Sequence, residues 1–302
     1  MTKLPKSLQG LTTTTKLYSA KVLNDAVLKT MRYFEFFQHA LRMEELHKFL
    51  SIKATKEEVQ SALDSLANQG KLHSKDGFWA LDESHIAIRR KHLSRNIRMI
   101  RAAHFVGKFI SLFPFVRGVY LSGSLSKHGA TNREDDLDFF IITKAHRVWT
   151  TKLLLIAFKK IFLFNREKYF CINLLMAEDQ LNLKKKNLYI ATEAASLIPL
   201  TNTKLLSTFL QQNPFVHRQF PNLEMPMPRN KGLRLNVFEG LIEIIGGAAL
   251  ERQAHKMFEK HVQNQRKESG YYDTSDGVSA YFPESVEESL LNHMSKSHLS
   301  DE

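Results

Sequence analysis

The spacing of apolar residues near the N-terminus predicts three helices followed by a two-stranded hairpin. The expected helices span residues 22–38, 43–50 and 55–70. Thr55 and Glu58 form a capping-box pattern at the start of the third helix, in which each side chain accepts a hydrogen bond from a free backbone N–H group. Asp76-Gly77 predicts the tight turn of the hairpin. This order is typical of a winged helix-turn-helix, which we expect over residues 22–85.

The third helix of this unit carries mixed charges on its outward face. Lys56 is accompanied by Glu57, Glu58 and Asp64, whereas a helix that reads the major groove needs cationic and amide side chains toward the DNA. We therefore favour a role in domain docking or substrate orientation, and sequence-specific DNA binding is the alternative.

A long helical pattern over residues 86–112 is expected to connect this unit to the rest of the chain. At about 100° per residue, Lys91, Arg95 and Arg98 share one stripe of the helix. The opposite side carries Leu93, Ile97 and Ile100. Two interpretations are open: the basic stripe guides RNA, DNA or a triphosphate toward a site, or it is an ordinary solvated face.

Residues 113–186 read as a small mixed sheet. One short apolar run ends at Leu121, a second begins just after Asp136, and a third covers residues 168–176 after a helical pattern over 144–164. Strand, turn, strand, helix and strand in this order suit a small mixed sheet. We therefore expect an α/β (α+β) fold with a mixed-sheet core.

The C-terminal third is expected to be helical and then acidic. Prolines between residues 214 and 228 predict a segment without regular structure that wraps the surface, and a helix over 233–261 is interrupted or closely packed at Gly246-Gly247. The expected organisation is an N-terminal extension (1–21), a winged-helix-like domain (22–85), a connecting basic helix (86–112), a mixed-sheet core (113–186), a helical C-terminal region (187–265) and an acidic, weakly ordered tail (266–302).

The amino-acid composition indicates which partners the protein can bind and which cellular compartment suits it. The net charge is +12, and residues 266–302 are acidic, so the remainder is more basic still and should attract polyanions. Cys171 is the single cysteine, which excludes a disulfide framework and favours a reducing cytoplasm. The apolar stretches are too short or too charged to span a bilayer, so we expect no membrane partner. The thirteen histidines lack zinc-site spacing, and there is no phosphate-binding loop of the Walker type.

The most informative motif is Gly123-Ser124 followed, after eleven residues, by Asp136-Leu137-Asp138. Side chains alternate along a strand, so Asp136 and Asp138 should point to one face. Two carboxylates there suit Mg²⁺, which completes its coordination with water and phosphate oxygens. The small turn residues offer backbone N–H groups and a hydroxyl to phosphates.

This motif resembles the signature of the DNA polymerase β-like nucleotidyltransferase superfamily, and the chain looks like bacterial nucleotidyltransferase-domain proteins. The resemblance implies that Gly123 forms the turn, that Ser124 contacts the β- or γ-phosphate, and that Asp136 and Asp138 hold Mg²⁺ or Mn²⁺. Lys127 and His128, just past the turn, are candidates for phosphate contact and equally for surface loop residues.

The resemblance also implies a third carboxylate on a later strand, and the sequence departs from it. The polar residue of the strand over 168–176 is Asn173, which can ligate a metal but cannot accept a proton at neutral pH. Three outcomes are open. Asp138 or solvent takes the proton of the acceptor, Glu178 or Asp179 substitutes for the missing carboxylate, or the site binds nucleotide without turnover.

The expected function is therefore transfer of a nucleoside monophosphate from Mg²⁺-bound ATP or another nucleoside triphosphate to a hydroxyl, with release of pyrophosphate. The acceptor is open among a small molecule, RNA, DNA and protein. The alternative is a weak or inactive nucleotidyltransferase fold that acts as a nucleotide- or nucleic-acid-binding regulator or as a toxin–antitoxin-type partner.

Overall fold

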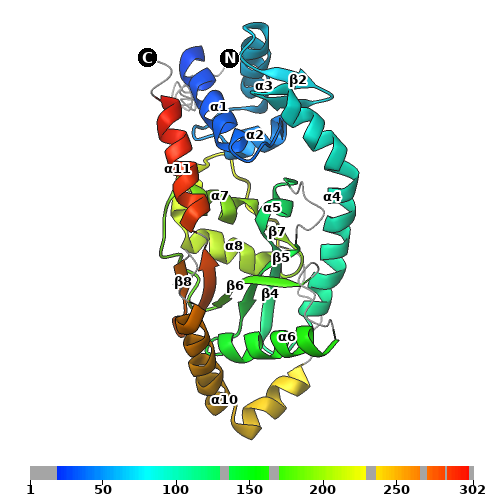
Figure 1. Ribbon diagram of the computed structural model, residues 1–302, viewed down its shortest axis with the longest axis vertical. Coiled ribbons are helices and arrows are strands. Elements are labelled where there is room, and N and C mark those ends of the chain that lie inside the picture. The colour runs from blue at the N-terminus through cyan, green and yellow to red at the C-terminus, as the bar shows by residue number, and fades with distance from the viewer. Residues whose placement is uncertain are drawn as a thin grey trace, which may run out of the picture.

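The computed structural model describes residues 19–129, 136–162, 170–228, 236–265, 271–282 and 284–298. The helices are α1 (Ala20–Glu35), α2 (Met43–Phe49), α3 (Lys56–Asn68), α4 (Glu83–Ile110), α5 (Gly123–Ser126), α6 (Val148–Phe162), α7 (Leu188–Ser196), α8 (Thr203–Gln212), α9 (Pro214–Gln219), α10 (Asn236–Gln265) and α11 (Glu284–His298). The strands are β1 (Leu41–Arg42), β2 (His73–Lys75), β3 (Phe78–Ala80), β4 (Val116–Leu121), β5 (Asp138–Thr143), β6 (Cys171–Ala177), β7 (Ile198–Pro199), β8 (Tyr271–Asp273) and β9 (Val278–Phe282). Figure 1 shows α1 to α3 at one end, the larger sheet in the middle, α10 at the other end and α4 along one side.

The N-terminal unit has the predicted order of three helices and a hairpin, namely α1, α2, α3 and β2–β3. The predicted capping box opens α3, because Glu58 N donates to Thr55 Oγ1 at 3.2 Å and Thr55 N donates to Glu58 Oε2 at 2.7 Å. Asp76 and Gly77 both have positive φ, as a tight hairpin turn requires. The short strand β1 pairs with β3 and adds a third strand that the sequence pattern did not predict. The expected extension over 1–21 lies outside the described residues up to residue 18, and α1 begins at Ala20.

In the described part of the chain, six strands form one mixed sheet in the order β7-β4-β5-β6-β9-β8. β4 and β5 are antiparallel, and β5 and β6 are parallel neighbours connected through α6. This is the strand, turn, strand, helix, strand connectivity expected for residues 113–186. The protein is therefore of mixed α/β architecture, as predicted.

Both faces of this sheet are buried, because successive residues of its strands enter two different cores. Phe140 and Ile142 of β5 belong to a cluster that includes side chains of α1, α3, α7 and α8. Phe139 and Ile141 belong to a second cluster that includes side chains of α4, α6 and α10. The side-chain alternation of a strand thus places Asp138, two residues before Phe140, on the face that the N-terminal unit covers.

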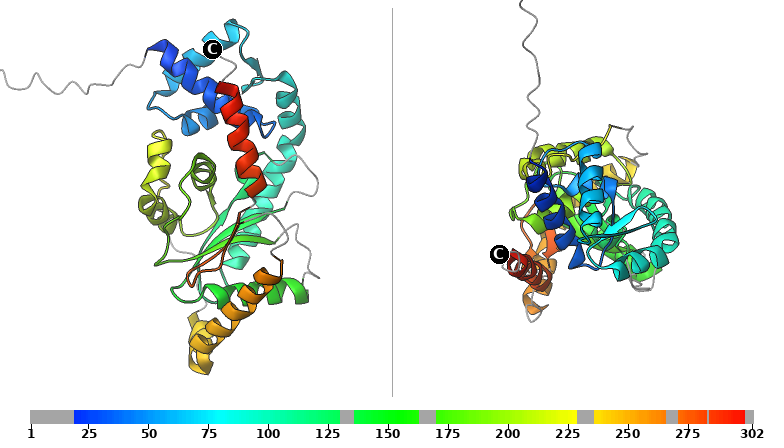
Figure 2. Two further views of the ribbon diagram at one scale, coloured as in Figure 1. Left: turned by 60° about the vertical axis from the view of Figure 1, so that its left-hand side comes forward. Right: turned by 90° about the horizontal axis from the view of Figure 1, so that it is seen from above.

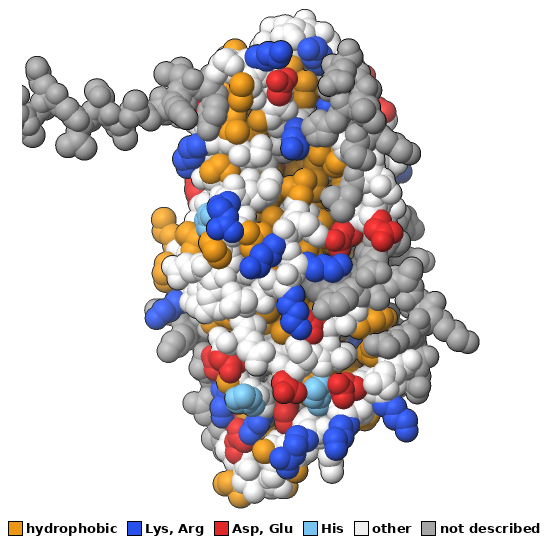
Figure 3. Space-filling view, turned by 90° about the vertical axis from the view of Figure 1, so that its left-hand side faces the viewer, with side chains coloured by type: hydrophobic (Ala, Val, Ile, Leu, Met, Phe, Trp, Pro, Cys, Tyr) orange, Lys and Arg blue, Asp and Glu red, His pale blue; other side chains and the backbone are white. Residues whose placement is uncertain are grey.

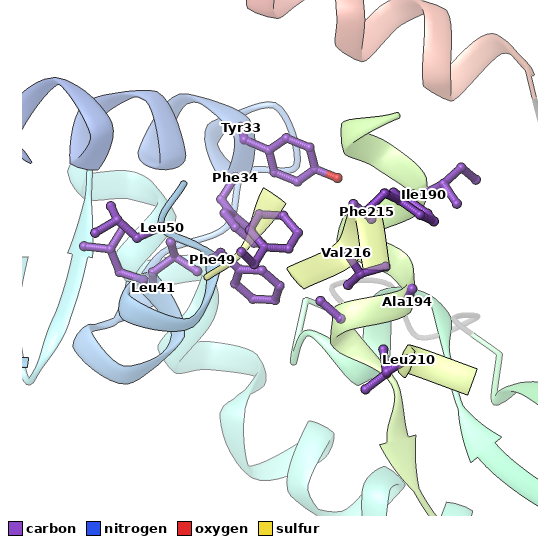
Figure 4. Close-up of a cluster of buried hydrophobic side chains, with 14 of the residues drawn as sticks. Tyr33, Phe34, Leu41, Phe49, Leu50, Ile190, Ala194, Leu210, Phe215 and Val216 are labelled. Carbon is purple, nitrogen blue, oxygen red and sulfur yellow. The ribbon is translucent and has the colours of Figure 1, made fainter. Parts of the chain in front are cut away.

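The N-terminal unit shares its core with the C-terminal helices and does not form a separate globule. Figure 4 shows Phe34 and Phe49 facing Ala194 and Val216 within one cluster. Polar contacts join the same regions, since Asn222 Nδ2 donates to Ile52 O at 2.8 Å. Segments about 170 residues apart in sequence therefore fold as one unit.

The buried side of α4 differs from the predicted one. Ile97, expected on the apolar side, is 39% exposed, whereas Arg89 and Asn96 are buried. Arg89 forms an ion pair with Glu45 at 2.7 Å and donates to Lys127 O at 3.2 Å. Asn96 Nδ2 donates to His128 O at 2.9 Å. The helix thus turns polar side chains inward because they satisfy backbone carbonyls of the neighbouring loop, a contact that a count of apolar residues does not reveal.

The acidic segment, expected to be weakly ordered, instead forms β8, β9 and α11. β9 pairs with β6, and β8 pairs with β9, so both extend the central sheet. α11 lies beside α1 (Figure 2), and the rings of His293 and Phe36 are 5.5 Å apart. The apolar residues Val278, Ala280, Leu290 and Met294 are buried, which outweighs the acidic composition on which the prediction rested.

Two smaller expectations have different outcomes. The first of the clustered prolines, Pro214, begins helix α9, so that part of the segment is regular; proline suits the first helical position because it needs no N–H donor there. The break predicted at Gly246-Gly247 is present, since Gly246 has a φ of 120° inside α10. α10 therefore consists of two helical pieces joined by a kink at Gly246.

Candidate functional site

A cavity of about 460 Å³ lies between the larger sheet and the helices α1, α7 and α8. Its polar end is formed by the turn between β4 and α5, by the start of β5 and by β6. Five of the seven residues predicted as site residues line it. They are Gly123, Ser124, Lys127, Asp138 and Asn173.

The turn residue Gly123 packs directly against the carboxylate of Asp138. Ser122 N donates to Asp138 O at 2.9 Å and fixes the end of β4 beside the start of β5. Gly123 then adopts a φ of +69°, which glycine tolerates and other residues rarely adopt. A Cβ atom at this position would overlap with Oδ2 of Asp138. The turn therefore leaves room for the carboxylate only because it has no side chain there.

Lys127 holds the far end of the turn. Its Nζ atom donates to Gly123 O at 2.9 Å and to Glu193 Oε1 on α7 at 2.8 Å. The backbone N–H of Gly129 donates to Ser124 O at 2.9 Å, which closes the loop. The hydroxyl of Ser124 thus lies on a turn whose backbone is tied to α7 and, through Arg89 and Asn96, to α4.

The carboxyl group of Asp138 is mostly buried, and its pKa is raised to about 6, chiefly by this burial. The charges of Asp136 and Glu193 contribute to the increase, whereas hydrogen bonds from the side chains of Cys171 and Asn173 act in the opposite direction. The pairing of β5 with β6 explains the last contact. Asp138 is opposite Cys171, and a register shift leaves Asn173 as an extra residue on β6 before Leu174 pairs with Phe140.

Two predicted site residues lie beside the cavity and do not line it. Asp136 is close enough to raise the pKa of Asp138 by its charge. The carbonyl of His128 accepts from Asn96, and burial lowers the pKa of its ring. Neither Glu178 nor Asp179 lines the cavity, and Glu178 Oε1 lies 3.9 Å from Arg117 Nε. These two residues follow the last residue of β6, whereas Asn173 near its start lines the cavity, so they do not supply the missing carboxylate.

Glu193 is the site residue that the sequence pattern missed. It lies on α7, lines the cavity and forms the ion pair with Lys127. Helix α7 reads LYIATEAAS, and Glu193 is its one residue of the Asp, Glu, Lys and Arg types. The sequence did contain one indication of this role, namely a single carboxylate in a short, otherwise uncharged and apolar helix. A carboxylate that is buried with such a helix needs a charged or polar partner.

Carboxylate oxygens are the ligands that a hard divalent cation prefers, and this corner has two carboxylates nearby. Asp138 lines the cavity, and the charge of Asp136 contributes to the raised pKa of Asp138. A bound cation would favour the charged form of such a desolvated acid. Mg²⁺ uses one or two carboxylates and fills its remaining positions with water and phosphate. Within the described residues, no group of three or more His, Cys, Asp or Glu side chains is placed so that it could hold a metal ion.

Comparisons of the chain with family models, curated proteins and solved structures found no match. None of the helices in the described ranges combines the length and the apolar character needed to cross a bilayer.

Proposed function

We propose that the protein is a metal-dependent nucleotidyltransferase that transfers a nucleoside monophosphate from a nucleoside triphosphate to a hydroxyl group. The observation that carries the proposal is the contact between Gly123 and the Asp138 carboxylate at the polar end of the cavity. A side-chain-free turn against a desolvated acid gives phosphate oxygens access to both backbone N–H groups and carboxylates. The resemblance of the motif to the DNA polymerase β-like superfamily supports the same reaction.

Each residue of the corner has a separate task in this proposal. Asp136 and Asp138 would hold Mg²⁺, which when bound neutralises phosphate charge and stabilises the leaving pyrophosphate. Ser124 donates its hydroxyl to a phosphate oxygen. Lys127 holds the turn in place through Gly123 O and through its ion pair with Glu193.

The transfer balances without another reactant. The acceptor oxygen forms a bond to the α-phosphorus while the bond from this phosphorus to the pyrophosphate oxygen breaks. The proton of the acceptor hydroxyl passes to Glu193, which is the second carboxylate that lines the cavity among the described residues. This assignment replaces Glu178 and Asp179 as substitutes for the absent third carboxylate.

The test is transfer of label from a nucleoside triphosphate labelled at the α-phosphate, with Mg²⁺ or Mn²⁺, to a fractionated cell extract. Wild-type protein is expected to label an acceptor, and the double variant Asp136→Asn, Asp138→Asn is expected to lose the labelling. The exposed Asp179→Asn is the control for removal of an acidic side chain outside the cavity. Equal labelling by the double variant would refute the proposal.

A nucleotide-binding regulator without turnover is the second candidate, and Asn173 is the observation that favours it. An amide takes the place beside Asp138 where the resemblance implies a carboxylate. Binding of a nucleoside triphosphate that depends on Asp136 and Asp138, with no labelled product from any extract fraction, would favour this candidate.

A further inference from the structure

The lining of the cavity contains side chains of two chemical kinds, and we call the polar set its polar half and the apolar set its apolar half. Its polar half contains Asp138, Ser124, Lys127 and Glu193. The other half is apolar and largely aromatic, and its walls include Phe37, Phe140, Leu174, Tyr189, Leu197 and Phe209. The transfer of a nucleoside monophosphate needs only the polar side chains of the cavity. The large apolar surface therefore indicates that an apolar group of some ligand binds there.

The apolar side chains that line the cavity are already fixed in place by the protein core. Ile190 and Ala194 of α7 and Phe209 of α8 line the cavity while their side chains are 2%, 5% and 1% exposed, because they also belong to the shared core. Phe140 on β5 forms the adjoining surface, and its ring centre is 5.2 Å from that of Phe209. Residues fixed in a core keep their positions when a ligand enters, so the cavity selects ligands by shape.

The charges of the cavity argue against a nucleic-acid acceptor. Among its described lining residues, Lys127 is the one lysine or arginine, and it is paired with Glu193. Burial and the nearby Arg89 charge lower the pKa of His39, so its ring is neutral. A single-stranded nucleic acid needs a groove of cations along its backbone as well as aromatic surfaces. Figure 3 shows one face of the molecule, with Lys and Arg side chains across its middle and Asp and Glu side chains beside and below them.

The size of the cavity sets the size of the ligand. A dry cavity of about 150 Å³ holds one benzene ring. The cavity here has about 460 Å³, which leaves room for a body of about two rings after the hydroxyl and the reacting phosphate are placed at the polar half.

We propose that the acceptor is a small hydroxyl compound with an apolar, ring-bearing body, which lies against Phe140, Tyr189 and Leu197 and directs its hydroxyl toward Asp138. Its role as acceptor rests on the proposed function, whereas its binding does not. The competing occupant of the apolar half is the base of the nucleoside triphosphate.

The test measures binding by calorimetry with two probes, naphthylmethanol and ethylene glycol, in the absence of metal and nucleotide. Naphthylmethanol is expected to bind saturably at one site, and ethylene glycol is not. Leu197→Trp fills the cavity and should weaken naphthylmethanol binding at least about tenfold. Leu205→Trp places the same side chain at a partly buried leucine of α8 outside the cavity and should leave binding unchanged. Circular dichroism establishes that both variants are folded.

A second titration adds a non-hydrolysable ATP analogue with Mg²⁺. Naphthylmethanol binding that persists at saturating analogue supports the proposal, and displacement would assign the apolar half to the nucleotide base and overturn it. Absence of saturable naphthylmethanol binding, or equal binding by Leu197→Trp, would also overturn it. The two proposals fail separately: loss of probe binding with label transfer intact rejects this inference alone, and intact probe binding without label transfer rejects the proposed function alone.

Discussion

The Cα atom of Gly123 faces the carboxylate of Asp138 so closely that a methyl group on it would overlap with Oδ2. The two residues lie on different elements, and Ser122, the neighbour of Gly123, donates its backbone N–H to Asp138 O. This contact makes the turn and the acid one structural unit, and a change in either displaces the other.

Replacement of Gly123 by alanine tests that unit. The positive φ and the overlap with Asp138 should together lower the free energy of unfolding by about 1–3 kcal/mol and abolish label transfer. Gly240→Ala is the matched control, because Gly240 is helical and its added Cβ would meet no atom within 4 Å. That variant should be neutral or up to about 1 kcal/mol more stable in urea denaturation. Equal stability of the two variants would contradict the described turn.

The ion pair between Lys127 and Glu193 should couple the turn to α7. Their side chains are 11% and 26% exposed, so solvent screens the pair less than it does a surface pair. We expect Lys127→Met and Glu193→Gln to show a coupling free energy of about 1–2 kcal/mol in a double-mutant cycle of urea denaturation. Additive effects of the two substitutions would show that the pair does not form in solution.

Asn222 tests whether the N-terminal unit is fixed to the C-terminal helices. Its side chain donates to Ile52 O at 2.8 Å and accepts from Ala54 N at 3.2 Å. Asn222→Ala leaves both backbone groups without this partner and should cost about 1–3 kcal/mol of unfolding free energy. Asn68→Ala, at an exposed position of α3, should stay within about 0.5 kcal/mol of wild type. Two separate unfolding transitions in the wild type would argue against the shared core.

His39 predicts a loss of stability in mild acid. Burial first, and the charge of Arg89 second, hold the pKa of its ring well below the ordinary value. Below about pH 6.5 the His39 ring therefore takes up a proton in the unfolded chain but not in the folded protein. The free energy of unfolding consequently decreases as the pH falls below this value. The slope from this one group approaches about 1.4 kcal/mol per pH unit. His39→Gln should flatten the dependence of unfolding free energy on pH between 6.5 and 5 by this amount, and an unchanged slope would contradict it.

Local sequence patterns predicted many of the helices and strands and the residues around Asp138. Features that depend on contacts between distant segments could not be predicted in this way. The capping box at Thr55, the turn at Asp76-Gly77 and the strands around Asp138 depend on neighbours in sequence. The burial of Arg89 depends on carbonyls and a carboxylate contributed by other elements. Glu193 reaches Lys127 across 66 positions, so no local pattern could place it at the site.

The acidic composition of residues 266–302 led to the prediction of a weakly ordered tail, whereas the described part of this segment forms two strands and a helix. Strands β8 and β9 form because β6 offers a free edge and because Val278 and Ala280 enter the core. Composition averages over such positions, and two or three buried residues at the right register decide the outcome.

The pairing of β6 with β9 has a consequence for synthesis on the ribosome. β5 and β6 can pair once residue 177 has emerged, yet the other edge of β6 finds its partner only when residues 278–280 follow, about a hundred residues later. At translation speeds of about 5–20 residues per second, this edge stays open for several seconds. A nascent chain of this protein therefore presents an unpaired backbone edge during about a third of its synthesis, and chaperones that shield such edges should determine its yield in cells.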